Sequence, residues 1–167
     1  MQLLASDYDG TLKQYSDKEK EPTVEKRDKE AIDEFRERGN LFGIVTGRSK
    51  GMIDLELKKY GIEIDFLIAQ NGSVIWSRDS QLLYVREISH ETAAQLADVM
   101  KEKKVVCFGA AGLEATGILY DNAQNISDSE RKNMRVESLT EEAFRQMTVI
   151  SFFIKNESGQ AAYLRQS

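Results

Sequence analysis

Three short apolar runs in the first half of the chain each end in a polar turn that contains glycine. The runs cover residues 2–6, 41–45 and 66–69, and runs of this length are typical of buried strands. Segments with helical periodicity separate them. Strands that alternate with helices through short connections are typical of a right-handed parallel βαβαβ unit. The first half therefore predicts an α/β fold with a parallel sheet.

The two intervening segments carry apolar residues at helical spacing. We expect the first helix to place these side chains on one face: Val24, Ala31, Ile32 and Phe35. Gly39 is a suitable residue to end it. The second helix is expected to bury Ile53, Leu57 and Tyr60 and to end at Gly61. The charged stretch before the first helix, around Pro22, predicts a solvated loop.

The pattern changes near the middle of the chain, and we place a domain boundary there, with residues 1–78 in one domain and 79–167 in a second, α+β domain. In the second domain the apolar patterns predict strands at 82–85, 105–108, 117–120, 148–154 and from 162 onward. They predict helices at 90–103 and 141–147. Residues 121–138 are polar and predict a loop that can include a short helix, and a turn is expected at 156–159.

The end of the first apolar run carries two carboxylates, Asp7 and Asp9, followed by Gly10 and Thr11. In open parallel sheets, ligands bind at the carboxyl ends of the strands. One carboxylate there can attack phosphorus while the other serves as general acid and base. Like charges this close need a cation, and carboxylates with a phosphate substrate favour Mg²⁺. Thr11 can hydrogen-bond the turn or orient Asp9. The alternative is an ordinary Asp-Gly turn.

Two further polar turns follow the second and third apolar runs. Thr46, Gly47 and Arg48 combine a hydroxyl, an amide at a helix start and a cation, which suits a phosphate group. The alternative is a helix cap with an exposed arginine. Asn71, before Gly72, is either a ligand residue or part of a hairpin turn. Three polar turns at successive strand ends favour a shared site.

These motifs resemble the Cof-type branch of the haloacid dehalogenase (HAD) superfamily, whose subclass IIB members carry an α/β cap after the third strand. The matching residues are Asp-Tyr-Asp-Gly-Thr-Leu at 7–12, Thr-Gly-Arg at 46–48 and Asn-Gly at 71–72. The resemblance covers residues 1 to about 76 well and the remainder by its general pattern. It implies a Rossmann-like parallel-sheet core with an inserted α+β cap domain.

The resemblance also implies roles for the site residues. Asp7 would form a phosphoaspartyl intermediate and bind Mg²⁺, and Asp9 would be the acid/base, with its backbone carbonyl on the metal. Thr46 would bind the phosphoryl group, and we assign Gly47, Arg48 and Asn71 to phosphate or substrate. Substrates of the family are mostly sugar phosphates and related small phosphoesters.

Two motifs of the family have no counterpart that we can assign in this sequence. These are a lysine supplied after the cap and an acidic loop that completes the Mg²⁺ shell. We therefore expect a fragment of a longer protein, ending within or just after the cap. The alternative is a naturally short chain that has lost catalysis or completes itself by oligomerisation. The missing part would supply strands on the other side of the first strand. Without them, Leu3, Leu4 and Ala5 would form an exposed apolar edge that is prone to pair with another chain.

Composition excludes several other classes. A net charge of −5 gives no electrostatic basis for nucleic-acid binding, and no apolar stretch is long enough to cross a membrane. Without a signal-peptide pattern at the start, and with the lone Cys107, we expect a cytoplasmic protein. Cys107 is expected to be buried and inert. His90, the only histidine, is expected on the surface rather than as a metal ligand.

Three functional hypotheses follow. The first is a Mg²⁺-dependent phosphatase that acts through an aspartyl-phosphate. The second, motivated by the missing lysine and acidic loop, is a catalytically incomplete binding or interaction module. The third is a sugar phosphomutase of the same superfamily.

Overall fold

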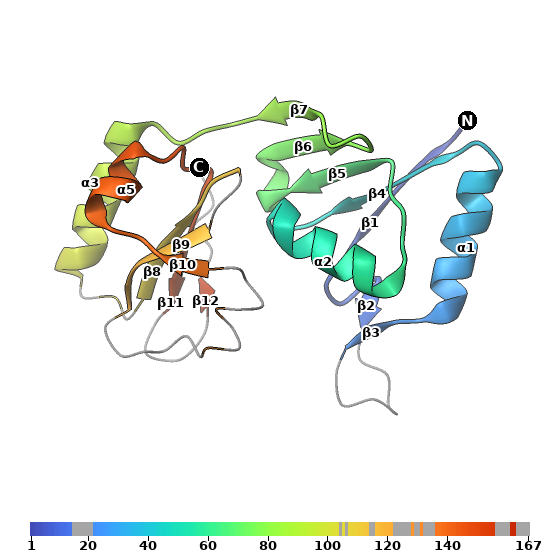
Figure 1. Ribbon diagram of the computed structural model, residues 1–167, viewed down its shortest axis with the longest axis horizontal. Helices are drawn as coiled ribbons and strands as arrows, with labels where there is room; N and C mark the ends of the chain where they lie inside the picture. The colour runs from blue at the N-terminus through green and yellow to red at the C-terminus, as the bar shows by residue number, and fades with distance from the viewer. Residues whose placement is uncertain are drawn as a thin grey trace. The chain divides into compact units, whose positions relative to one another are not determined.

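The computed structural model describes residues 1–14, 22–103, 105, 107–113, 116–121, 128, 131, 136–155 and 161–162. The chain divides into two compact units, Met1–Val85 and Arg86–Ser167 (Figure 1). The sequence pattern predicts a domain boundary after residue 78. The division lies later because strand β7 (Leu82–Val85) pairs with β6 (Val74–Ser77) in the sheet of the first unit.

The first unit contains a five-stranded sheet in the order β1-β4-β5-β6-β7. Strands β1 (Leu3–Asp7), β4 (Leu41–Val45) and β5 (Phe66–Ala69) are parallel, which confirms the predicted parallel sheet. Strand β6 then returns antiparallel to β5 after a short 3-10 turn, η1 (Gln70–Gly72). The Asn-Gly pair thus forms a turn between antiparallel strands, which agrees with the hairpin turn given as one of its two interpretations.

Both helices predicted for the first unit are present, as α1 (Lys26–Glu37) and α2 (Lys50–Tyr60). Gly61 ends α2 in the left-handed conformation, with φ of 64°, which glycine adopts without steric cost. The prediction that Val24 lies on the first helix was wrong. Val24 lies in β3 (Thr23–Val24), which pairs with β2 (Lys13–Gln14), so its side chain is buried in a small hairpin before α1 begins.

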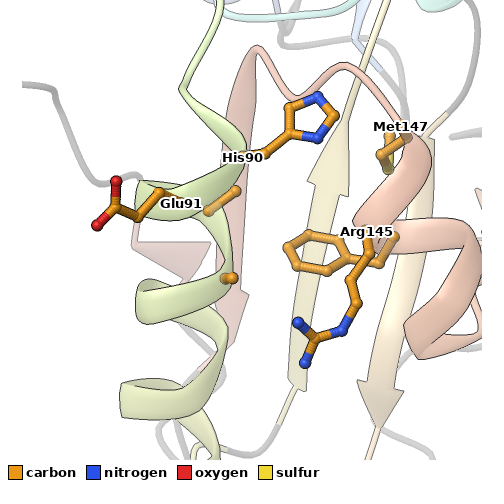
Figure 2. Close-up of a pocket in the computed structure, with 7 residues that line it drawn as sticks. His90, Glu91, Arg145 and Met147 are labelled. Carbon is orange, nitrogen blue, oxygen red and sulfur yellow. The ribbon is translucent and has the colours of Figure 1, made fainter.

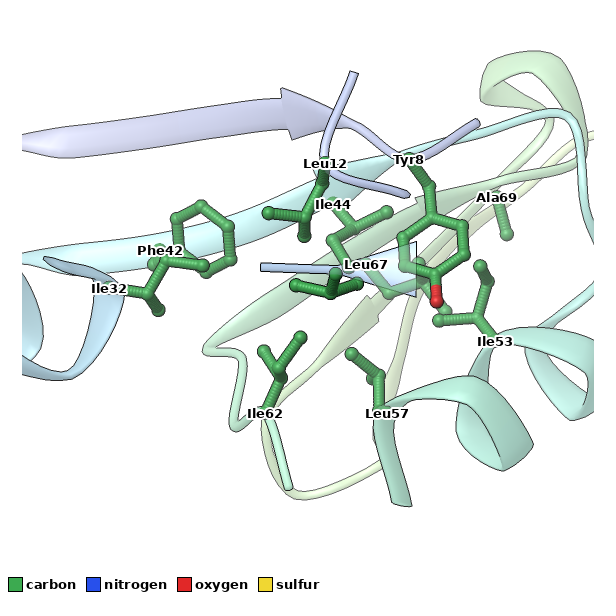
Figure 3. Close-up of a cluster of buried hydrophobic side chains, with 11 residues drawn as sticks. Tyr8, Leu12, Ile32, Phe42, Ile44, Ile53, Leu57, Ile62, Leu67 and Ala69 are labelled. Atoms are coloured by element: carbon green, nitrogen blue, oxygen red, sulfur yellow. The ribbon is translucent and has the colours of Figure 1, made fainter. Parts of the chain in front are cut away.

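The core of the first unit lies where the helices meet the sheet (Figure 3). Strand β4 is central to it because β1 and β5 flank it on both sides, and Phe42 and Ile44 are 1% and 0% exposed. The buried side chains of this core are Tyr8, Leu12, Val24, Ile32, Phe42, Ile44, Ile53, Leu57, Ile62, Leu67 and Ala69. Burial of each large apolar side chain stabilises the fold by about 1.5–3 kcal/mol.

Strand β1 is an edge strand of the described sheet, with β4 as its neighbour. Leu3 is 65% exposed and Leu4 is 46% exposed. This confirms the expected apolar edge. An uncovered edge offers unpaired backbone groups to another strand, and self-association through it stays a prediction.

The second unit contains another five-stranded sheet, in the order β10-β9-β8-β11-β12. Its strands are β8 (Cys107–Ala111), β9 (Thr116–Asp121), β10 (Val136–Ser138), β11 (Ser151–Lys155) and β12 (Ala161–Ala162). Its longer helices are α3 (His90–Glu102) and α5 (Glu141–Gln146). Strands β9 and β10 are parallel and the other neighbours are antiparallel. The predicted α+β character is confirmed.

Several predicted strand limits in this unit differ from the structure. Strand β8 continues past residue 108, and β11 begins later than residue 148, because Ser151 pairs with Ala111 and so fixes where the two strands overlap. Strand β10 falls within the segment predicted as a polar loop. The predicted turn at 156–159, most of 121–135 and residues 163–164 lie outside the described residues.

Aromatic side chains form the centre of the second unit. The rings of Phe108 and Phe152 stack with centroids 5.2 Å apart, and Phe144 meets Phe108 edge-on. Cys107 is fully buried, as expected. In the part of the chain that the structure describes, no helix combines the length and the apolar character needed to cross a membrane.

Candidate functional site

Asp7 is the last residue of β1, and the backbone turns sharply after it at Gly10, with φ of 81°. The backbone N–H of Tyr8 donates to Asp7 Oδ1 at 2.8 Å. The hydroxyl of Thr11 donates to Asp7 Oδ2 at 3.3 Å. Of the two roles expected for Thr11, a hydrogen bond within the turn or contact with Asp9, the structure shows the first, and the bond orients Asp7. Asp7 remains exposed at the carboxyl end of the strand.

Asp9 is bound by Arg48 of the next parallel strand's loop. Arg48 Nε donates to Asp9 Oδ2 at 2.7 Å, and Arg48 Nη2 donates to Asp9 Oδ1 at 2.5 Å. The Asp9 side chain is 51% exposed and that of Arg48 25%. A bidentate pair of this kind is directional as well as charged. The structure thus brings two predicted site residues into direct contact.

Thr46, Gly47 and Asn71 meet beside this pair. Asp7 is in register with Val45, so Thr46 follows at the same sheet edge. The side-chain oxygen of Thr46, which is 5% exposed, accepts from the Arg48 backbone N–H at 3.1 Å. The backbone N–H of Asn71 donates to the Thr46 carbonyl at 3.2 Å. A hydroxyl that accepts one bond keeps its own proton to donate.

Gly47 lies close to the side chain of Asn71. A Cβ added at residue 47 would lie 3.0 Å from Asn71 Oδ1, which is tighter than ordinary van der Waals contact. Asn71 itself has a left-handed backbone, with φ of 58°, a conformation that asparagine tolerates better than most residues. The two turns therefore pack against each other at the end of the sheet.

A layer of polar side chains that the sequence did not reveal lies beneath the turn that carries Asp7 and Asp9. Glu56 of α2 accepts from the Tyr8 hydroxyl at 2.9 Å and from Lys13 Nζ at 2.8 Å. It also lies 3.6 Å from Arg48 Nη1. Figure 3 shows the Tyr8 hydroxyl directed toward α2.

A sequence signal for Glu56 did exist. It comes three residues after Ile53 and four before Tyr60, so it shares the inward face of α2 with them. A charged residue at a core-facing position is uncommon unless it is paired.

Charge and burial act together on these groups. Burial lowers the pKa of Arg48, but its hydrogen bonds to Asp9 and the charges of Asp9 and Glu56 outweigh burial and raise it. Burial likewise raises the pKa of Glu56, yet hydrogen bonds from Lys13 and Tyr8 bring the pKa below its ordinary value. Burial, followed by the Glu56 hydrogen bond, raises the pKa of Tyr8. Arg48 and Glu56 are therefore charged at neutral pH, and Tyr8 is neutral.

The side-chain oxygen donors that the acidic motif offers a metal are the carboxylates of Asp7 and Asp9, beside the backbone carbonyl expected from Asp9. Within the described ranges, no group of three or more His, Cys, Asp or Glu side chains is gathered in a way that could hold a metal ion. Mg²⁺ in phosphate-processing sites commonly takes one or two carboxylates, with water and phosphate completing its shell. The exposed Asp7 carboxylate fits that role, whereas the Asp9 carboxylate is engaged by Arg48.

The second unit contains a separate pocket of about 280 Å³ between α3 and α5. His90, exposed as expected, lies at its rim, and Phe144 and Ala93 are buried beneath it. Figure 2 shows that the Glu91 carboxylate points away from the other labelled side chains. None of the residues predicted for the site lines this pocket.

The fold and the site define an α/β protein with an acidic pair and a basic, glycine-containing loop at the carboxyl edge of a parallel sheet. The chain belongs to the family of haloacid dehalogenase-like hydrolases, which matches residues 4–167. This confirms the resemblance inferred from the motifs. No protein with a curated description matches the chain.

Solved structures of HAD proteins have the same fold. A haloacid dehalogenase-like hydrolase from Bacteroides thetaiotaomicron superposes with a TM-score of 0.73 at 18% identity, over 95% of this chain and 59% of its own. A HAD phosphatase from the same organism gives 0.71 at 18% identity, over 94% and 56%. A HAD subclass IIB sugar phosphatase gives 0.68 at 21% identity, over 92% and 57%. The chain thus spans less than three-fifths of the length of each of these proteins.

Proposed function

We propose that this protein takes part in the hydrolysis of small phosphomonoesters through an aspartyl-phosphate intermediate on Asp7. The observation that carries the proposal is the grouping of the Asp7 and Asp9 turn with the Thr46–Arg48 loop at one sheet edge. The family, whose members are hydrolases, supports it.

In the proposed first step, a carboxylate oxygen of Asp7 attacks phosphorus and the bond from phosphorus to the substrate's alcohol oxygen breaks. Asp9, in its protonated form, gives its proton to that departing oxygen. In the second step, Asp9 takes a proton from a water molecule, and the water oxygen attacks the phosphorus of the aspartyl-phosphate. Inorganic phosphate leaves, and Asp7 returns to its carboxylate form.

The Asp9–Arg48 pair must open for this cycle to run, because a carboxylate held in a bidentate ion pair is poorly suited to carry a proton. A phosphate group is an equally good partner for a guanidinium. In the proposal, the substrate phosphate replaces Asp9 on Arg48, and the same event frees Asp9 for proton transfer. In the same proposal, the Thr46 hydroxyl donates to the phosphoryl group.

Mg²⁺ would be held by the Asp7 carboxylate and would offset the repulsion between that carboxylate and the phosphate. The substrate class is proposed from the HAD subclass IIB sugar phosphatase among the similar structures, so sugar phosphates are the first compounds to test. In this proposal the protein binds small phosphorylated molecules rather than nucleic acids, in keeping with its net charge of −5.

The test is phosphate release from a panel of sugar phosphates, with and without Mg²⁺, by the wild-type protein and by Asp7→Asn. Asp79→Asn serves as the control, because Asp79 is exposed in the turn between β6 and β7. We expect Asp7→Asn to abolish release and Asp79→Asn to match the wild type. Wild-type activity no higher than that of Asp7→Asn on every compound would refute the proposal.

The binding-module hypothesis keeps one observation in its favour, the limited set of carboxylates at the site in the described residues. It predicts that inorganic phosphate binds and that no phosphoester is hydrolysed. A phosphomutase would instead convert one sugar phosphate into its isomer, which product analysis by NMR detects.

A further inference from the structure

We propose that Glu56 is a positioning residue for Arg48, which keeps the guanidinium at the site when phosphate replaces Asp9. This inference rests on the proposed role of Arg48 in binding phosphate. It does not depend on whether the bound phosphoester is hydrolysed.

Arg48 is held from two sides by two carboxylates. Its Nε and Nη2 atoms face Asp9, and its remaining terminal nitrogen, Nη1, lies 3.6 Å from Glu56 Oε1. Because the guanidinium is rigid and planar, the contact with Glu56 does not use the edge that binds Asp9. Phosphate can therefore take the Asp9 edge while the Glu56 contact persists.

Glu56 is itself fixed in place. Its Oε2 atom accepts from the Tyr8 hydroxyl and from Lys13 Nζ, which leaves Oε1 directed to Arg48. The Glu56 side chain is 18% exposed and that of Lys13 is 12% exposed. Tyr8 is fully buried. A carboxylate held by two donors and covered from solvent cannot follow the guanidinium outward.

The ring of Tyr8 adds to the same arrangement. The Arg48 guanidinium carbon lies 5.5 Å from the centre of this ring, within the range of a cation–π interaction. Tyr8 lies between Asp7 and Asp9 in the chain, so its anchoring by Glu56 also holds the turn that carries both carboxylates. Glu56 of α2 thus supports both Arg48 and the turn that carries Asp7 and Asp9.

The substitution Glu56→Gln tests this idea, because the two possible effects change the affinity for phosphate in opposite directions. It removes a negative charge near a phosphate site, which on charge alone tightens phosphate binding. Loss of positioning instead weakens it, and we expect the Kd of inorganic phosphate, with Mg²⁺ present, to rise roughly tenfold. Asp54→Asn is the matched control, since it removes the same charge from α2 and frees Lys50, its partner at 2.6 Å.

Isothermal titration with inorganic phosphate gives these constants, and thermal denaturation reports whether each variant is folded. The effect of Glu56→Gln should vanish in an Arg48→Ala background, which a general loss of stability would not produce. If Glu56→Gln does not fold, Tyr8→Phe removes one of the two donors that fix Glu56 and should weaken phosphate binding several-fold.

Unchanged or tighter phosphate binding by Glu56→Gln would overturn the inference, and so would a wild-type protein that binds no phosphate. Weaker binding by Glu56→Gln in a protein that hydrolyses no phosphoester would support the inference and refute the proposed function. The two proposals therefore fail separately.

Discussion

Arg48 joins Asp9 across the sheet edge through two short hydrogen bonds, of 2.7 Å and 2.5 Å, to the two carboxylate oxygens. The pair links the turn after β1 to the loop after β4. In this state the proposed acid/base residue is neutralised by the proposed phosphate ligand. Under the proposed mechanism this arrangement would tie proton transfer to substrate binding, because the same guanidinium would serve both carboxylate and phosphate.

Replacing Asp9 by asparagine should separate these two roles. We expect Asp9→Asn to lower kcat for a sugar phosphate by about 10²–10⁴-fold, because an amide cannot carry the proton. Binding of inorganic phosphate should be equal or tighter, because Arg48 loses its competing anion. Steady-state kinetics and calorimetric titration measure the two effects. A variant with wild-type kcat would show that Asp9 is not the acid/base.

Replacing Arg48 by lysine should weaken binding without removing the charge. A lysine ammonium cannot make the bidentate contact that the guanidinium makes. We expect Arg48→Lys to raise KM for a sugar phosphate roughly tenfold, which corresponds to about 1.4 kcal/mol. The comparison of KM and kcat for wild type, Arg48→Lys and Arg48→Ala checks this. Equal KM values for all three would place Arg48 outside the substrate site.

An ion pair at the other end of the strands should make stability depend on pH. Asp65 accepts from Arg36 Nε at 2.9 Å and from the Phe42 backbone N–H at 3.0 Å, and its side chain is 11% exposed. The Arg36 hydrogen bonds lower the pKa of Asp65, against the opposing effect of burial. The stabilisation is therefore complete above the ordinary aspartate pKa of 3.8 and is lost as the pH falls through the lowered value.

We expect Asp65→Asn to reduce the free energy of unfolding at pH 7 by about 2 kcal/mol, the scale of a hydrogen bond to a charged group. The difference from wild type should shrink at the acid end of a series of urea denaturations between neutral and strongly acidic pH. Glu63→Gln is the control, because the Glu63 side chain is 67% exposed and surface pairs contribute little. A difference that is independent of pH would contradict the assignment.

Gly43 should be a position where even one methyl group destabilises the fold. A Cβ added there would lie 2.4 Å from a ring carbon of Phe66 on the neighbouring strand. We expect Gly43→Ala to cost about 1–3 kcal/mol, the range for overpacked sites. Urea denaturation measures it. Gly43→Ala combined with Phe66→Leu should recover part of the loss, and no recovery would mean that the backbone rather than the ring is the cause.

The local motifs of the sequence identified the candidate residues at each strand end separately. Asp7 and Asp9 two residues apart, and Thr46 to Arg48 after the next apolar run, were identifiable because strand ends and turns have short-range signatures. The parallel strands followed from the same short-range pattern. That part of the fold depends on the alternation of strand and helix, which can be recognised from the order of the segments in the sequence.

Tertiary structure alone decided which of these groups touch. The contact of Arg48 with Asp9 spans 39 positions, and the contact of Tyr8 with Glu56 spans 48. Such pairings depend on how α2 packs on the sheet. The boundary after Val85 and the hairpin that buries Val24 were likewise set by strand pairing, because a short apolar run does not by itself identify the segment with which it pairs.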